Sequence, residues 1–223
     1  MQTRKLLRQS LAPVVDLLYP PRCPICGEAV GEHGGLCQSC WSGLVFPVSG
    51  EGEGNTQISA ATVYNDTSRQ LVLAFKHGGR FALAGLLSRL MLARLPVLEG
   101  KWLVVPVPLH RRRLWTRGYN QSALLAQEIA RARGKTLVVD ALHRHRATPS
   151  LGGLGKAARA RVLDGAIRAN PRHLERLRGA NILLVDDVMT SGATTTSCCN
   201  ALRQAGAAQV HIACFAQVMD EAI

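Results

Sequence analysis

The segment from residue 182 to residue 194 constrains the fold of this chain more than any other. It reads Ile-Leu-Leu-Val-Asp-Asp-Val-Met-Thr-Ser-Gly-Ala-Thr. The uninterrupted apolar run predicts a strand buried on both faces of a parallel sheet, and the small residues after the acids predict a turn into a helix. We therefore expect a strand at 182–185, Asp186 and Asp187 just past its end, and a helix from 192 to 205.

The same segment has the groups needed to bind a phosphorylated sugar. The C-terminal end of a parallel strand opens into the crevice where α/β sheets bind ligands. The first turn of the next helix offers unpaired N–H groups to a phosphate, and a glycine allows close approach. Two carboxylates would accept hydrogen bonds from vicinal ribose hydroxyls, although a lone acid here could simply cap the helix. The full pattern favours ligand binding by Asp186, Asp187, Thr190, Ser191, Gly192, Ala193 and Thr194.

From residue 58 onward, short apolar runs alternate with helical patterns. This alternation predicts right-handed crossovers and a doubly wound, mainly parallel α/β sheet with helices on both faces. The region from 143 to 178 has the weakest periodicity and is expected to include a long loop. The other expected strands are 58–64, 102–107, 137–142 and 209–215, and the other expected helices are 67–76, 81–95 and 120–133.

A second candidate site segment follows the expected strand at 102–107. Two prolines in a Pro-Val-Pro sequence end regular strand pairing there and are followed by four arginines within seven residues. An arginine cluster is usually a solvated surface, but the position just after a sheet strand favours neutralisation of a pyrophosphate. The residues concerned are Pro106, Val107, Pro108, Arg111, Arg112, Arg113 and Arg117.

The N-terminal part of the chain contains two C-x-x-C pairs, Cys23 with Cys26 and Cys37 with Cys40. Paired knuckles of this kind predict a structural zinc held by four thiolates, whereas redox chemistry is the less favoured alternative. A helix expected at 5–18 leads into this module, and residues 49–55 have the composition of a linker. The chain is therefore predicted to divide into a zinc-ribbon module at 1–50 and an α/β domain at 56–223.

Composition narrows the possible partners. The formal net charge is +12 and the pI is about 10.1, which favours phosphate-rich partners such as a nucleotide, nucleic acid or anionic membrane surface. No signal peptide is predicted, because Pro13 and Asp16 interrupt the N-terminal apolar run and no cleavage site follows it. No uncharged apolar stretch approaches the roughly 20 residues of a membrane span. A cytoplasmic location is expected.

Taken together, these motifs resemble the ComF (GntX-like) family of competence-associated, type I phosphoribosyltransferase-like proteins. The resemblance rests on the Pro-Val-Pro turn, the sequence Arg-Gly-Tyr-Asn-Gln at 117–121, the acid-acid loop, the N-terminal cysteines and Lys76. It implies that phosphoribosyl pyrophosphate binds with Mg²⁺, with its ribose hydroxyls on Asp186 and Asp187 and its 5-phosphate on 190–194. It further implies that 106–108 form the pyrophosphate loop and that 146–161, including Arg159, close over the substrate.

The sequence leaves two functions open. The first is transfer of a phosphoribosyl group, for which the acids and Gly192 are intact. The second is a non-catalytic role in DNA uptake, in which the basic surface and zinc ribbon hold single-stranded DNA or a helicase-like competence protein. Leu151 and Val162 stand where the resemblance predicts glutamine and asparagine, which favours the second function.

Overall fold

The computed structural model describes residues 20–32, 34–47, 50–51, 56–77, 82–145 and 165–219. The helix expected at 5–18 and the loop expected at 146–161 lie outside these ranges. No helix among the described residues is long and apolar enough to cross a membrane.

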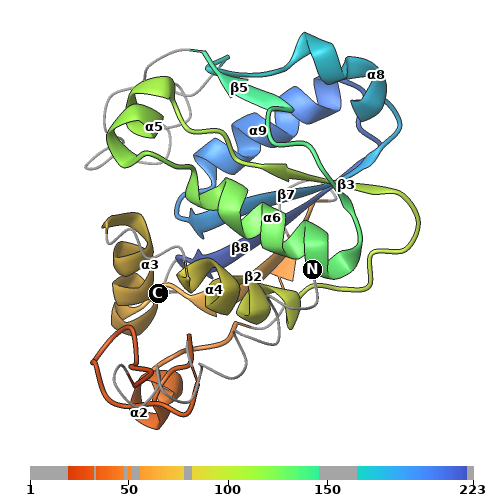
Figure 1. Ribbon diagram of the computed structural model, residues 1–223. Coiled ribbons are helices and arrows are strands. Elements are labelled where there is room, and N and C mark those ends of the chain that lie inside the picture. The colour runs from red at the N-terminus through yellow and green to blue at the C-terminus, as the bar shows by residue number, and fades with distance from the viewer. Residues whose placement is uncertain are drawn as a thin grey trace, which may run out of the picture.

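A six-stranded twisted sheet forms the centre of the described residues (Figure 1). Five strands are parallel, and the edge strand β1 pairs antiparallel with β2. The strands in spatial order are β1 (Gly50–Glu51), β2 (Gln57–Val63), β8 (Gln209–Gln217), β7 (Asn181–Met189), β3 (Trp102–Pro106) and β4 (Thr136–Leu137). The predicted fold class, a mainly parallel α/β sheet, is confirmed.

Helices cover both faces of this sheet. Helices α3 (Asp66–His77), α4 (Leu83–Leu92) and α6 (Gln121–Arg133) pack on one face, and α9 (Ala193–Gln204) packs on the other. Successive residues of β7 enter opposite cores, with Leu183 in the first and Leu184 in the second. Because the central strands are buried on both faces, they appear in the sequence as continuous apolar runs.

The structure corrects three expectations about secondary structure. Strand β7 continues through both acids to Met189, because β8 offers it pairing partners as far as Gln217. The strand expected at 137–142 is divided between β4 and β5 (Leu142–Arg144), since the chain turns around the exposed Asp140. Strand β5 leaves the main sheet and pairs antiparallel with β6 (Ile167–Ala169).

Four short helices among the described residues were not expected from the sequence. They are α2 (Gln38–Ser42), α5 (Arg111–Arg117), the 3₁₀ turn η1 (Pro171–His173) and α8 (Leu174–Leu177). Four of the seven residues of α5 are arginine, so an apolar periodicity is hardly visible there.

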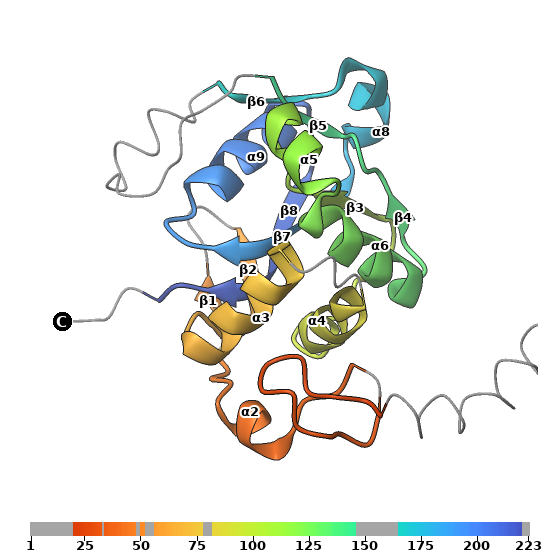
Figure 2. The ribbon, with the colours of Figure 1, turned by 60° about the vertical axis from the view of Figure 1, so that its left-hand side comes forward.

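The cysteine-bearing segment packs directly on the sheet domain, beside α3 and α4 (Figure 2). It includes a bridge between Arg22 and Ala29 and helix α2 (Gln38–Ser42). The chain leaving α2 joins the main core through the buried Leu44, and the backbone N–H of Val63 donates to the Val45 carbonyl at 2.7 Å. The two parts therefore share core contacts, and the division at residues 50 and 56 stays a prediction.

Candidate functional site

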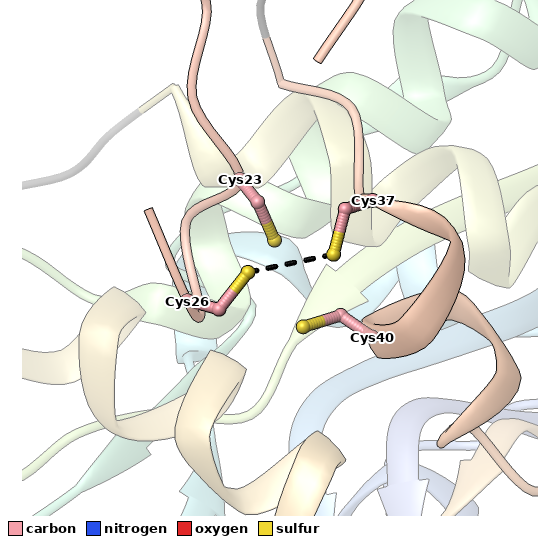
Figure 3. Close-up of side chains that lie close together, drawn as sticks. All are labelled: Cys23, Cys26, Cys37 and Cys40. Atoms are coloured by element: carbon pink, nitrogen blue, oxygen red, sulfur yellow. Dashed lines mark hydrogen bonds between the residues drawn. The ribbon is translucent and has the colours of Figure 1, made fainter. Parts of the chain in front are cut away.

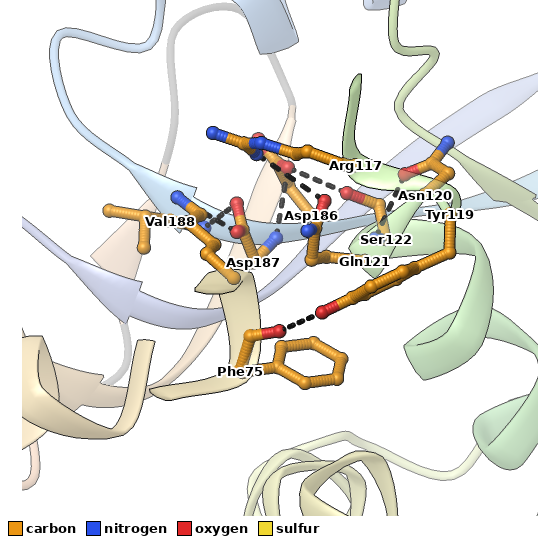
Figure 4. Close-up of polar contacts among 10 residues, drawn as sticks. Phe75, Arg117, Tyr119, Asn120, Gln121, Ser122, Asp186, Asp187 and Val188 are labelled. Carbon is orange, nitrogen blue, oxygen red and sulfur yellow. Dashed lines mark hydrogen bonds and ion pairs between the residues drawn. The ribbon is translucent and has the colours of Figure 1, made fainter. Parts of the chain in front are cut away.

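Two aspartates near the C-terminal end of β7 form the centre of the candidate site (Figure 4). Asp186 is 8% exposed, and its Oδ1 accepts hydrogen bonds from Ser122 Oγ at 3.0 Å and from the Asp187 N–H at 2.9 Å. Asp187 is 9% exposed and forms an ion pair with Lys76, whose Nζ lies 2.9 Å from Oδ2. The site thus holds two nearly buried carboxylates beside one ammonium group.

Burial gives Asp186 an unusual proton affinity. Desolvation and then the neighbouring charge of Asp187 raise its pKa, while the hydrogen bonds from Ser122 and the Asp187 N–H and the charge of Lys76 lower it. The resulting pKa of Asp186 is about 7. Hydroxyl groups of a ligand that donate to this carboxylate would favour its ionised form.

The loop at 190–192 leads from the acids into helix α9. Gly192 has φ of +72°, a left-handed conformation that side chains with a Cβ adopt at a cost. The Thr195 hydroxyl is turned inward and donates to the Gly192 carbonyl at 2.8 Å, so it serves the turn. The residues proposed from the sequence, 190–194, are exposed or half-buried at the start of a twelve-residue helix. Such a helix start presents N–H groups and a positive dipole end to an anion.

The Pro-Val-Pro turn lies beside β7, the strand that contains Asp186 and Asp187. The Val107 N–H donates to the Val185 carbonyl at 2.9 Å, just before the acid pair. Asn120 Nδ2 donates to the Val107 carbonyl at 3.0 Å, and Asn120 Oδ1 accepts from the Ser122 N–H to cap α6. The Tyr119 hydroxyl donates to the Phe75 carbonyl, next to Lys76. The segment 119–122 therefore ties three separate parts of the site together.

The arginines after the turn are distributed unevenly around the site. Arg117 is half-buried and its Nη1 lies 3.5 Å from Gln121 Oε1, whereas Arg111 and Arg113 are exposed on α5. Burial, followed by the charge of Arg113, lowers the pKa of the buried Arg144 on β5. Arg159, Leu151 and Val162 lie outside the described residues. The structure describes the backbone of Arg112 but not its side chain.

Sequence reasoning missed the supporting role of Ser122 and the position of Gln121. Ser122 lies 64 residues from Asp186 along the chain, and no local pattern indicates that contact. The helix cap at Asn120 could be inferred from the sequence, because asparagine is a preferred N-cap before a helical pattern.

The four N-terminal cysteines converge into one cluster (Figure 3). Their sulfur atoms all lie within 4.8 Å of one another, and Cys26 Sγ and Cys37 Sγ are 3.4 Å apart. A tetrahedral zinc with bonds of about 2.3 Å holds its sulfurs roughly 3.8 Å apart, so the cluster fits a zinc ion. Although desolvation raises the pKa of Cys23, backbone hydrogen bonds at Cys26, Cys37 and Ile25 outweigh it and lower that pKa to about 6. With four thiol ligands, the site is suited to a structural metal and has no open position for catalysis.

Fold and site together define a protein of the phosphoribosyltransferase fold with an N-terminal zinc ribbon. In agreement, residues 14–51 match the double zinc ribbon domain family and residues 120–222 match the phosphoribosyl transferase domain family. Because residues 14–51 contain four cysteines, they can supply one four-cysteine metal site.

Curated relatives identify the family more narrowly. The chain is 30% identical to the DNA utilization protein YhgH of Escherichia coli K12, over 88% of this chain and 90% of that protein. It is 29% identical to YhgH of Salmonella typhimurium with the same coverage, and 26% identical to Competence protein F of Haemophilus influenzae over 86% and 82%. A solved structure of the allosteric regulatory enzyme of purine biosynthesis covers 64% of this chain and 30% of its own, at 21% identity and a TM-score of 0.44. The protein belongs to the ComF family, which includes YhgH and Competence protein F.

Proposed function

We propose that this protein binds phosphoribosyl pyrophosphate, or a closely related ribose 5-phosphate ligand, together with Mg²⁺. In this proposal Asp186 and Asp187 accept hydrogen bonds from the ribose hydroxyls, and residues 190–194 hold the 5-phosphate. The pyrophosphate lies between the Pro-Val-Pro turn and the positive side chains proposed to contact it. The turn consists of Pro106, Val107 and Pro108, and the positive residues are Lys76, Arg113, Arg117 and Arg159.

One observation carries this proposal. Two aspartates are buried side by side, with residue exposures of 8% and 9%, and Asp187 lies five positions before Gly192, which begins helix α9. Burying two negative charges side by side is costly, and a phosphate alone would be repelled by them. A ligand with vicinal hydroxyls at one position and a phosphate at the next uses both features. Phosphoribosyl pyrophosphate is such a ligand.

Transfer of the phosphoribosyl group is the reaction that this site would support. The bond between ribose carbon 1 and the pyrophosphate oxygen breaks, and a nucleophile forms the new bond to carbon 1. Mg²⁺, when bound, offsets the negative charge of the departing pyrophosphate. The chain's own residues hold the ribose by its hydroxyls and phosphate, so that carbon 1 is fixed between the acids and the turn.

Calorimetric titration tests the proposal. The unaltered chain is expected to bind phosphoribosyl pyrophosphate in the presence of Mg²⁺ with one site per chain. Asp187→Asn is expected to weaken that binding by at least roughly tenfold, since it removes a charged hydrogen-bond acceptor worth about 1.5–3 kcal/mol. Asp140→Asn, the same substitution at an exposed acid outside the site, is expected to bind like the unaltered chain. Absence of binding by the unaltered chain would exclude the proposed function.

A second candidate function, nucleic-acid binding, is favoured by the surface of α5. Trp115 is 90% exposed there, and Arg111 and Arg113 are exposed on the same helix. An exposed ring between positive charges suits a strand of nucleic acid, because its bases stack and its phosphates pair with arginine. The names of the curated relatives refer to DNA utilization and competence, which agrees with such a role.

Fluorescence anisotropy with a labelled single-stranded oligonucleotide distinguishes the two functions. Trp115→Ala is expected to weaken binding by about 5- to 150-fold, the range of one base stacked on an aromatic ring. Trp41→Ala, at an exposed tryptophan of the zinc module, serves as the matched control. Equal losses in both variants, or none in either, would contradict a nucleic-acid contact at α5. Oligonucleotide binding that survives Asp187→Asn would show a surface separate from the acid site.

A further inference from the structure

Gln121, the first residue of α6, has a side-chain N–H₂ group without a hydrogen-bond acceptor among the described residues. Gln121 is 2% exposed, and none of the described residues accepts a hydrogen bond from its Nε2. A buried amide donor without an acceptor costs roughly 1–3 kcal/mol, so native proteins rarely keep one without a reason. The position of Gln121 in the site supplies that reason.

The polar side chains on either side of Gln121 are engaged in holding the site together. Asn120 caps α6 and holds the Pro-Val-Pro turn, and Ser122 holds Asp186. Arg117 Nη1 lies 3.5 Å from Gln121 Oε1 and so orients the amide. In Figure 4 the Gln121 side chain extends from the start of α6 toward Arg117 and the acid pair. The amide oxygen therefore faces Arg117, and the N–H₂ group remains for a ligand.

We propose that the Gln121 amide donates a hydrogen bond to a ribose hydroxyl oxygen of the ligand held by Asp186 and Asp187. This inference rests on the function proposed above and adds a residue that determines ligand specificity. A hydroxyl group has one proton to donate and two lone pairs to accept with. A carboxylate takes the proton, and the neutral amide supplies the matching donor. A phosphate oxygen is the poorer partner at this point, because two carboxylates lie beside it.

The Gln121 N–H₂ group makes no hydrogen bond to any of the described residues of the ligand-free protein. Removing it should therefore weaken ligand binding without lowering the stability of the fold. Gln121→Met keeps the length of the side chain and deletes the amide. We expect the melting temperature of the ligand-free protein to stay the same or to rise by about 2–4 °C, the shift for about 1 kcal/mol in a chain of this size. Affinity for phosphoribosyl pyrophosphate with Mg²⁺ is expected to fall about 3- to 10-fold.

The choice of ligand tests which atom Gln121 contacts. Ribose 5-phosphate is expected to lose the same factor as phosphoribosyl pyrophosphate in Gln121→Met. Inorganic pyrophosphate is expected to lose less, because only the contact between Arg117 and Gln121 Oε1 changes in its site. Gln127→Met is the matched control, because Gln127 is an exposed glutamine on the same helix. Gln121→Glu provides a second variant that keeps the acceptor for Arg117 and lacks the donor. It is expected to show at least the same loss of affinity.

Several results would overturn the inference. Unchanged affinity in both Gln121 variants, or an equal loss for pyrophosphate, would exclude a contact with a ribose hydroxyl. A fall of several degrees in the ligand-free melting temperature of Gln121→Met would assign the residue to the fold alone. If the unaltered chain binds neither sugar phosphate, the proposed function fails and this inference fails with it. Binding by the unaltered chain with full affinity in the variants would refute the inference alone.

Discussion

Replacing Asp186 with asparagine is expected to stabilise the ligand-free protein while weakening its binding of a sugar phosphate. The asparagine side chain has the same shape, and its Oδ1 can accept the two hydrogen bonds that now come from Ser122 Oγ and the Asp187 N–H. It carries no charge, so it avoids both the desolvation and the repulsion from Asp187 that raise the pKa of Asp186. The carboxylate is therefore a group that costs the fold stability and is kept for a ligand.

The size and pH dependence of this effect follow from the pKa. Folding raises the pKa of Asp186 from 3.8 to about 7, so between these values the folded protein keeps a proton that the unfolded chain releases. The contribution of Asp186 to stability is complete below pH 4, declines as pH rises, and levels off above pH 7. The free energy of unfolding changes by about 1.36 kcal/mol per pH unit in this range. It should therefore be higher in Asp186→Asn than in the unaltered chain by roughly 2 kcal/mol at pH 5 and roughly 4 kcal/mol at pH 8.

Thermal unfolding at pH 4, 5, 7 and 8 measures this difference directly. The gap in melting temperature should widen from near zero at pH 4 to roughly 10 °C at pH 8. Asp140→Asn is the control of opposite sign, since the hydrogen bond from His173 lowers the pKa of Asp140. It should not stabilise the protein at any of these pH values. A gap that is absent, reversed or independent of pH would refute the view that Asp186 is a destabilising buried acid.

Three further changes test other parts of the molecule. Gly192→Ala places a Cβ at φ +72° without a close contact, so unfolding should become easier by about 1–2 kcal/mol and ligand affinity should fall in titration. Gly43→Ala would put a Cβ 2.5 Å from Thr67 Oγ1, where the zinc module meets α3. Its melting temperature should drop by several degrees and recover in the double variant with Thr67→Ala, and failure to recover would contradict this contact. Elemental analysis should find one zinc per chain, and Cys26→Ser should lose it.

The sequence predicted those features that depend on local patterns. The apolar run at 182–185 indicated a strand buried on both faces, and the small residues around Gly192 indicated the turn into α9. The spacing of the cysteines indicated a four-sulfur cluster, which the structure brings within 4.8 Å. In each case a short stretch of chain contains the whole physical reason for its structure.

Features that depend on contacts between distant segments were beyond the reach of the sequence. The extension of β7 through Asp186 depends on pairing with Cys214 of β8. The contact of Ser122 with Asp186 depends on where α6 is packed. The role of Gln121 could not be predicted for the same reason. That its Nε2 lacks an acceptor in the described part of the chain matters only because the residue is buried, and its burial depends on the packing of α6. Helix α5 was missed because its arginines conceal the helical pattern.

A crystal structure of the protein with phosphoribosyl pyrophosphate and Mg²⁺ tests the central claim most directly. The 5-phosphate is expected on the N–H groups at 192–194, with the ribose hydroxyls within hydrogen-bond distance of the Asp186 and Asp187 carboxylates. Pyrophosphate seated on residues 190–194, or a ligand bound away from the acid pair, would contradict the account.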